Sequence, residues 1–129
     1  MDTDLIDRWS AMGAVEWGVN DCAACCANQL FRWSGHDPAK DWRVDDGFLA
    51  WGKTAGPEVV KRMLRATTQP GFQRVKPVNA PPMALGLGHI GNWTFGLALG
   101  KGWWIWRAEP GATVTTTEAV RYAWVWRPT

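Results

Sequence analysis

The stretch Trp17-Gly18-Val19-Asn20-Asp21-Cys22 decides how this chain is interpreted, because it places a cysteine at the start of an apolar segment. The residues from Cys22 to Trp33 are apolar on nearly all sides, which predicts a buried helix. A thiol in the first helical turn lies beside free N–H groups and the positive end of the helix dipole, an environment that lowers a thiol pKa. The stretch therefore predicts a nucleophilic thiolate at Cys22. The alternative is a buried structural residue, since cysteine also behaves as a small hydrophobe.

The composition is that of a globular chain, with 47% hydrophobic and 20% charged residues among 129, and we expect a single domain. The net charge of +2 comes from scattered basic residues, which argues against a nucleic-acid partner. No secretory signal and no run long enough to span a membrane are recognisable. Three cysteines within five residues are badly placed for a disulfide framework, so reduced thiols are expected.

Helical patterns in residues 1–69 are followed by strand patterns in residues 70–129, which predicts an α+β domain with an antiparallel sheet in its second part. Asp2 or Thr3 is expected to cap a first helix, Asn20 or Asp21 a second, and Gly35 to end the second. Gly56-Pro57 is interpreted as a break before a further helix. The expected elements are helices around 5–12, 22–33, 48–51 and 59–64, a helical turn at 117–120, and strands at 72–75, 93–99, 103–107, 112–115 and 122–127.

The organisation of a helical part with a cysteine at the start of its central helix, followed by an antiparallel sheet, resembles the papain-like cysteine peptidases of the NlpC type. The pattern W-G-x-N-D-C, followed by Gly35-His36-Asp37-Pro38, resembles a compact phage-encoded branch of that superfamily. The similarity continues through the segments Phe95–Gly100 and Ala123–Arg127 and spans nearly the whole chain.

This resemblance implies a component of the tail tip of a phage or gene transfer agent, made in the host cytoplasm and carried in the virion. Its implied partners are other tail-tip or hub proteins and peptidoglycan, whose peptide stems the related enzymes cleave. The alternative is a structural plug or adaptor of the tail tip without enzymatic activity.

Cysteine catalysis also requires a histidine base and a polar residue that orients it. In the family that the chain resembles, the histidine begins a strand, and alignment on Gly96 and Gly100 puts Thr94 at that position. His89 is then the candidate base by elimination; it is flanked by Gly88 and Gly91 and is expected in a loop. On the next strand only Arg107 is polar, and a cation is a poor partner for a histidine that must become cationic.

The family's acidic residue before the first sheet strand is also missing, because the corresponding stretch is Pro82-Met83-Ala84-Leu85. We therefore predict a degenerate catalytic set. If the site is active, Cys22 attacks an amide carbonyl and backbone N–H groups at the helix start stabilise the oxyanion.

Two further constellations are conspicuous. One is the C-x-x-C-C pattern of Cys22, Cys25 and Cys26. Structural zinc needs ligand pairs from two segments, so we expect no metal and no cofactor.

The other is a predicted strand that contains Trp103, Trp104 and Trp106, which puts indoles on both faces of the sheet. We favour a docking surface for a partner protein; a sugar-stacking platform and burial under the chain's own helices are the alternatives.

Overall fold

The fold is described from a computed structural model, which covers residues 2–15, 21–40 and 55–128. Three α-helices precede an antiparallel sheet of six strands in these ranges, which confirms the mixed α+β class. The short helix expected around residues 48–51 lies outside the described residues. The elements are α1 (Thr3–Ser10), α2 (Cys22–Ser34), α4 (Ala55–Ala66), β1 (Phe72–Val75), η2 (Pro77–Asn79), β2 (Leu85–Ile90), β3 (Asn92–Gly100), β4 (Trp103–Arg107), β5 (Ala112–Thr116), η3 (Thr117–Ala119) and β6 (Val120–Trp126).

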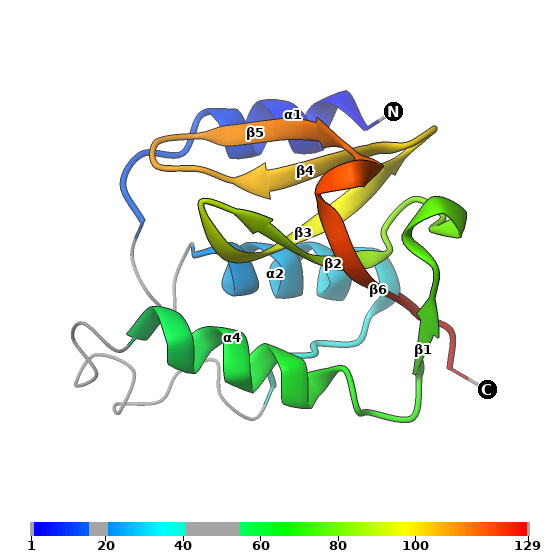
Figure 1. Ribbon diagram of the computed structural model, residues 1–129. Coiled ribbons are helices and arrows are strands. Elements are labelled where there is room, and N and C mark those ends of the chain that lie inside the picture. The colour runs from blue at the N-terminus through cyan, green and yellow to red at the C-terminus, as the bar shows by residue number, and fades with distance from the viewer. Residues whose placement is uncertain (1, 16–20, 41–54, 129) are drawn as a thin grey trace.

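The strands are ordered β1-β6-β2-β3-β4-β5, and each neighbouring pair is antiparallel. One core joins apolar residues of all three described helices to one face of this sheet, with Trp9 of α1, Leu30 of α2 and Met63 of α4 among its buried members. In Figure 1, α1 runs along β5 at one end of the sheet, and β1 lies at the other end. The helices therefore cover a single face, which we call the helix face.

The termini of α2 follow the predicted capping pattern. Asp21 is the N-cap, and its Oδ1 accepts a hydrogen bond of 2.9 Å from the Ala24 N–H. Gly35 ends the helix in the left-handed conformation with φ of 79°, where a glycine has no steric penalty. The helix α4 begins at Ala55, so Gly56-Pro57 stands in its first turn rather than before it. Proline is tolerated there because the first-turn N–H groups have no intrahelical partner.

The strand β2 was not predicted, and His89 lies in it rather than in a loop. The loop was expected because Gly88 and Gly91 flank His89, but the strand contains two glycines, Gly86 and Gly88, for a reason of packing. A Cβ at Gly86 would lie 2.5 Å from the Trp104 ring, and one at Gly88 would lie 2.8 Å from the Trp106 ring. Glycine is therefore needed in this strand because indole rings from β4 lie against it.

Candidate functional site

The thiol at the start of α2 faces the sheet. Cys22 is the first residue of α2, and α2 packs on β3. The backbone N–H of Phe95, in β3, is directed at its sulfur, as is that of Ala23. Cys22 is partly buried and packs against the core of the helix face. The helix start therefore presents the sulfur to the backbone of β3 at Phe95.

The environment of Cys22 favours a protonated thiol. Burial is the largest effect and raises the pKa of Cys22 to about 12, and the nearby charge of Asp21 raises it further. The N–H groups of Phe95 and Ala23 act in the opposite direction but are weaker. The expectation of a lowered pKa is therefore wrong, because loss of hydration outweighs the hydrogen bonds that these N–H groups offer to the sulfur. Burial likewise raises the pKa of Cys25 to about 11 and that of Cys26 well above its ordinary value.

Neither histidine makes a hydrogen bond or ion pair with Cys22 within the described part of the chain. His89 is exposed on β2, and its ring makes an edge contact with Trp93, its cross-strand partner, at a centroid distance of 5.4 Å. His36 follows the other end of α2. Its ring stacks on Trp126 at 4.0 Å, and its Nε2 contacts Gln69 Oε1.

Thr94 occupies the strand position at which the resemblance places a histidine. Its hydroxyl donates a hydrogen bond of 3.0 Å to the carbonyl oxygen of Asn92. A threonine hydroxyl cannot accept a proton near neutral pH, so it cannot replace an imidazole as a general base. Thr94 lies between Trp93 and Phe95 along β3, so its side chain is on the face opposite the helices and away from Cys22.

Arg107, on β4, has a structural role in this arrangement. It is buried, and its guanidinium donates hydrogen bonds to the carbonyls of Gly13 at 2.7 Å and Gly111 at 2.9 Å. It also contacts the carbonyls of Ala14 and Ala108, and its charge lies close enough to Cys25 to lower that residue's pKa slightly against the effect of burial. These contacts join the segment after α1 to the β4–β5 turn.

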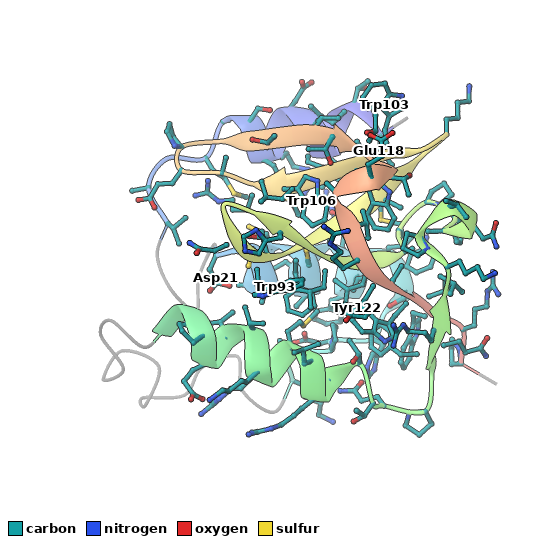
Figure 2. The ribbon with its side chains drawn as sticks, viewed as in Figure 1. Asp21, Trp93, Trp103, Trp106, Glu118 and Tyr122 are labelled. Atoms are coloured by element: carbon teal, nitrogen blue, oxygen red, sulfur yellow. The ribbon has the colours of Figure 1, made fainter. Side chains whose placement is uncertain are left out.

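The three tryptophans of β4 have different environments. Trp104 and Trp106 are buried, at 1% and 0% exposure, on the face opposite the helices. Their indole N–H groups donate to the hydroxyls of Thr117 and Thr115. Trp103 is 41% exposed, and Figure 2 shows it at the margin of the sheet beside Glu118, while Trp106 lies over the sheet.

The prediction that all three form a docking surface is therefore corrected for Trp104 and Trp106, because the chain itself covers them. Their rings lie over the glycines of neighbouring strands and under the segments around η2 and η3. Of the three, Trp103 is the residue that a partner can reach.

The helix face carries exposed aromatic side chains that the sequence analysis did not single out. Trp93 is two residues before Phe95 in β3, so both side chains lie on the helix face. Trp93 is 47% exposed. Tyr122, on β6, is 41% exposed on the same face, and Figure 2 shows both on the side of α4. The guanidinium of Arg74 lies 4.6 Å from the centre of the Tyr122 ring. The sequence signal for these side chains was the position of Trp93 two residues before Phe95, which puts both on one face of a strand.

The sulfur atoms at the start of α2 form no metal site in this structure. Cys25 Sγ lies 3.6 Å from Met12 Sδ, and all three cysteines are free thiols. In the described ranges, no group of three or more His, Cys, Asp or Glu residues is arranged to hold a metal ion. None of the described helices is long and apolar enough to cross a membrane.

Comparison with known protein families and with curated proteins finds no match to this chain.

Proposed function

We propose that this chain is a tail-tip component of a phage or gene transfer agent, built on a papain-like fold of the NlpC type, whose cysteine site no longer hydrolyses peptides. The proposal combines the sequence resemblance with the chemistry of the Cys22 site. The observation that carries the loss of activity is that neither histidine makes a hydrogen bond or ion pair with Cys22 within the described residues, while burial raises the pKa of this thiol to about 12.

The arrangement of the elements supports the papain-like assignment. A cysteine begins the central helix α2, that helix packs on an antiparallel sheet, and the sulfur is directed at a backbone N–H of β3. In the family that the chain resembles, the base comes from the start of this strand. By the alignment on Gly96 and Gly100, Thr94 stands there in this chain, so the sequence fits descent from a cysteine peptidase with the base replaced.

The energetics of the thiol argue against activity. A thiol with a pKa of about 12 is ionised in roughly one molecule in 10⁵ at pH 7, against about one in 100 for a thiol with the ordinary pKa of 9.0. Cysteine peptidases need the thiolate as nucleophile, and an adjacent imidazolium normally maintains it. Without that partner the thiolate of Cys22 is about a thousand-fold scarcer than that of an ordinary thiol.

The exposed aromatic side chains support a role in an assembly. Trp33 is 50% exposed, Phe31 49%, Trp93 47% and Trp103 41%. Large aromatic side chains are enriched at protein interfaces because they bury much area at a small cost in side-chain entropy. A tail-tip protein that contacts several neighbours would use such residues on more than one face.

Loss of hydrolysis is tested by incubating the purified chain with peptidoglycan and measuring released peptide fragments by mass spectrometry. We expect no release above that of the Cys22→Ala variant, which is the matched control. Release by the natural chain that Cys22→Ala abolishes would contradict the proposal and would make His89 the base to test next by His89→Ala.

The tail-tip assignment is tested separately by mass spectrometry of gradient-purified particles from the phage or cell that encodes the chain. We expect the chain to co-purify with tail proteins at a fixed stoichiometry. Particles that contain the other tail proteins but lack this chain would overturn the assignment, whatever the result of the hydrolysis assay.

A further inference from the structure

Two strands at one end of the sheet, β1 and β6, each place an exposed side chain on the helix face. Arg74 of β1 pairs with Trp124, which is buried in the core of that face. Tyr122 of β6 pairs with Leu87, another member of that core. Since strand partners lie on the same face, Arg74 and Tyr122 both lie on the helix face. The guanidinium of Arg74 lies 4.6 Å from the centre of the Tyr122 ring and 5.8 Å from that of Trp124, so these rings hold the cation on the surface.

The next two strands of the sheet, β2 and β3, continue this surface. His89 follows Leu87 by two residues, so it also lies on the helix face, and it pairs with Trp93 of β3. The His89 ring makes an edge contact with the Trp93 ring at a centroid distance of 5.4 Å. Both side chains are exposed, and Figure 2 shows Trp93 and Tyr122 on the same side of the sheet. We call the set of Arg74, Tyr122, His89 and Trp93 the exposed strip.

The two large rings of the exposed strip are too far apart for one small flat ligand to cover both. Tyr122 and Trp93 are 41% and 47% exposed, and β2 lies between their strands. The strands β6 and β3 are therefore about 10 Å apart. An extended ligand with repeated flat groups can stack on both rings, which favours a polymer.

The charges around the exposed strip favour an anionic ligand. No Asp or Glu occurs between Glu58 and Glu109 and none occurs in β6, so the four strands of the strip contain no acidic residue. Arg74 is exposed, and no carboxylate of the described residues forms an ion pair with it. Lys76, which follows β1, is exposed as well. A phosphate that approaches the strip therefore meets positive charge that no acid of these strands neutralises.

A sugar-binding platform fits the exposed strip less well. A neutral sugar stacks on aromatic rings, but it gains nothing from the cations, and the strip has no carboxylate or carboxamide side chain to accept hydrogen bonds from sugar hydroxyls. The net charge of +2 predicts no nucleic-acid partner. However, all but two of the 12 acidic residues lie in residues 1–58, so the net charge does not describe the strip.

We propose that the exposed strip binds single-stranded nucleic acid, with bases stacked on Trp93 and Tyr122 and phosphates beside Arg74 and Lys76. Aromatic rings combined with cations bind single strands without sequence preference, since every base has a π-face. The inference rests on the sheet surface, is independent of the cysteine site and goes beyond the proposed function. With two stacking rings and two cations, we expect a dissociation constant on the order of 0.1 mM.

Fluorescence anisotropy of a labelled thymidylate oligonucleotide of about 15 residues tests the proposal with the purified chain. Each neutralised phosphate contributes a slope of about −0.7 to the logarithm of the association constant against the logarithm of salt concentration. Two phosphates therefore predict binding that weakens about 25-fold when sodium chloride rises from about 0.05 to about 0.5 M. An abasic oligonucleotide of the same length should bind at least about fivefold more weakly, because it has no bases to stack. Absence of binding at about 1 mM chain, or equal binding of the abasic strand, would overturn the proposal.

Matched aromatic substitutions locate the binding on the exposed strip. Trp93→Ala should weaken binding at least about fivefold, whereas Trp93→Phe keeps a stacking ring and should stay within about threefold of the natural chain. Trp103→Ala removes a similarly exposed indole at the other end of the β3–β4 hairpin and should have no effect. Circular dichroism checks that each variant is folded. Equal losses in Trp93→Ala and Trp103→Ala would contradict the assignment to the strip.

Matched charge substitutions test the phosphate contact. Arg74→Gln should reduce the salt slope from about −1.4 to about −0.7, because one phosphate loses its cation. Lys101→Gln removes an exposed cation from the β3–β4 turn and should leave the slope unchanged. An unchanged slope in Arg74→Gln would show that Arg74 contacts no phosphate and would exclude the proposed arrangement.

Competition identifies the class of ligand. An oligouridylate of the same length should displace the labelled strand within about threefold of the thymidylate, because RNA and DNA share the phosphates and base faces that the strip contacts. A chitin hexasaccharide at about 1 mM should not displace it. Displacement by the sugar would assign the strip to carbohydrate instead. A preference above about tenfold for RNA or DNA would require recognition of the 2′-hydroxyl outside the strip and would also contradict the proposal.

Discussion

Single residues on the outer face of the sheet decide how its tryptophans are buried. The rings of Trp104 and Trp106 lie against strand positions without side chains, and Gly88 is one of these. A Cβ there would lie 2.5 Å from the backbone oxygen of Ala119 and 2.8 Å from the Trp106 ring. The backbone of η3 and a fully buried indole cannot both move away without loosening this second core.

We predict that Gly88→Ala lowers the free energy of unfolding by about 1 to 3 kcal/mol, the usual cost of overpacking a core. The measurement is urea denaturation followed by tryptophan fluorescence. Gly13→Ala is the control, because a Cβ at Gly13 meets no atom within 4 Å, and it should be nearly neutral. Equal effects of the two substitutions would contradict the enclosed packing at Gly88.

At the scale of the element, the start of α2 combines a capping function with an electrostatic one. The Asp21 side chain is buried, caps Ala24, and raises the pKa of Cys22 through its charge. An asparagine provides the same capping oxygen without the charge, whereas an alanine provides neither. The two functions of this residue can therefore be separated by substitution.

We predict that Asp21→Asn increases the rate at which iodoacetamide alkylates Cys22 at about pH 8.5, because the thiol pKa falls when the neighbouring negative charge is removed. Alkylation is followed by peptide mass spectrometry, which distinguishes Cys22 from Cys25. Asp21→Ala should in addition lose at least about 1 kcal/mol of stability through the missing cap. An unchanged alkylation rate in Asp21→Asn would show that Asp21 does not control the thiol.

At the scale of the whole molecule, Arg107 joins parts of the chain that are distant in sequence. It lies in β4 and holds the carbonyls of Gly13, after α1, and of Gly111, before β5. These bonds are made by a planar guanidinium with several donors in fixed directions, which a lysine cannot reproduce. The position of α1 beside β5 therefore depends on the shape and donor directions of the Arg107 guanidinium as well as on its charge.

We predict that Arg107→Lys lowers the free energy of unfolding by about 2 to 4 kcal/mol, since buried carbonyls lose charge-assisted hydrogen bonds. Thermal unfolding by circular dichroism measures the loss. Arg121→Lys, at an exposed position of β6, should change stability by less than about 0.5 kcal/mol. A loss no larger than that of Arg121→Lys would contradict the anchoring role.

The predictable parts of the site are those set by neighbouring residues in the sequence. The ends of α2 are predicted by Asp21 before Cys22 and by Gly35 after Ser34. The hairpin of β3 and β4 is predicted by the apolar residues on both sides of Gly100-Lys101-Gly102. The absence of a base at Thr94 was likewise visible from the alignment of Gly96 and Gly100. The catalytic role of Cys22 and His89 stays a prediction for the hydrolysis assay.

The amino-acid sequence alone specified the α+β class, both ends of α2 and the residue types available near Cys22, because capping and periodicity act over a few neighbouring residues. Tertiary packing was needed to establish that Gly86 and Gly88 belong to a strand, that Trp104 and Trp106 are buried, and that burial raises the pKa of Cys22. Each of these depends on atoms from distant segments. The helix dipole acts from within α2, but the loss of water around the thiol arises from packing against the sheet, and that loss is the larger effect.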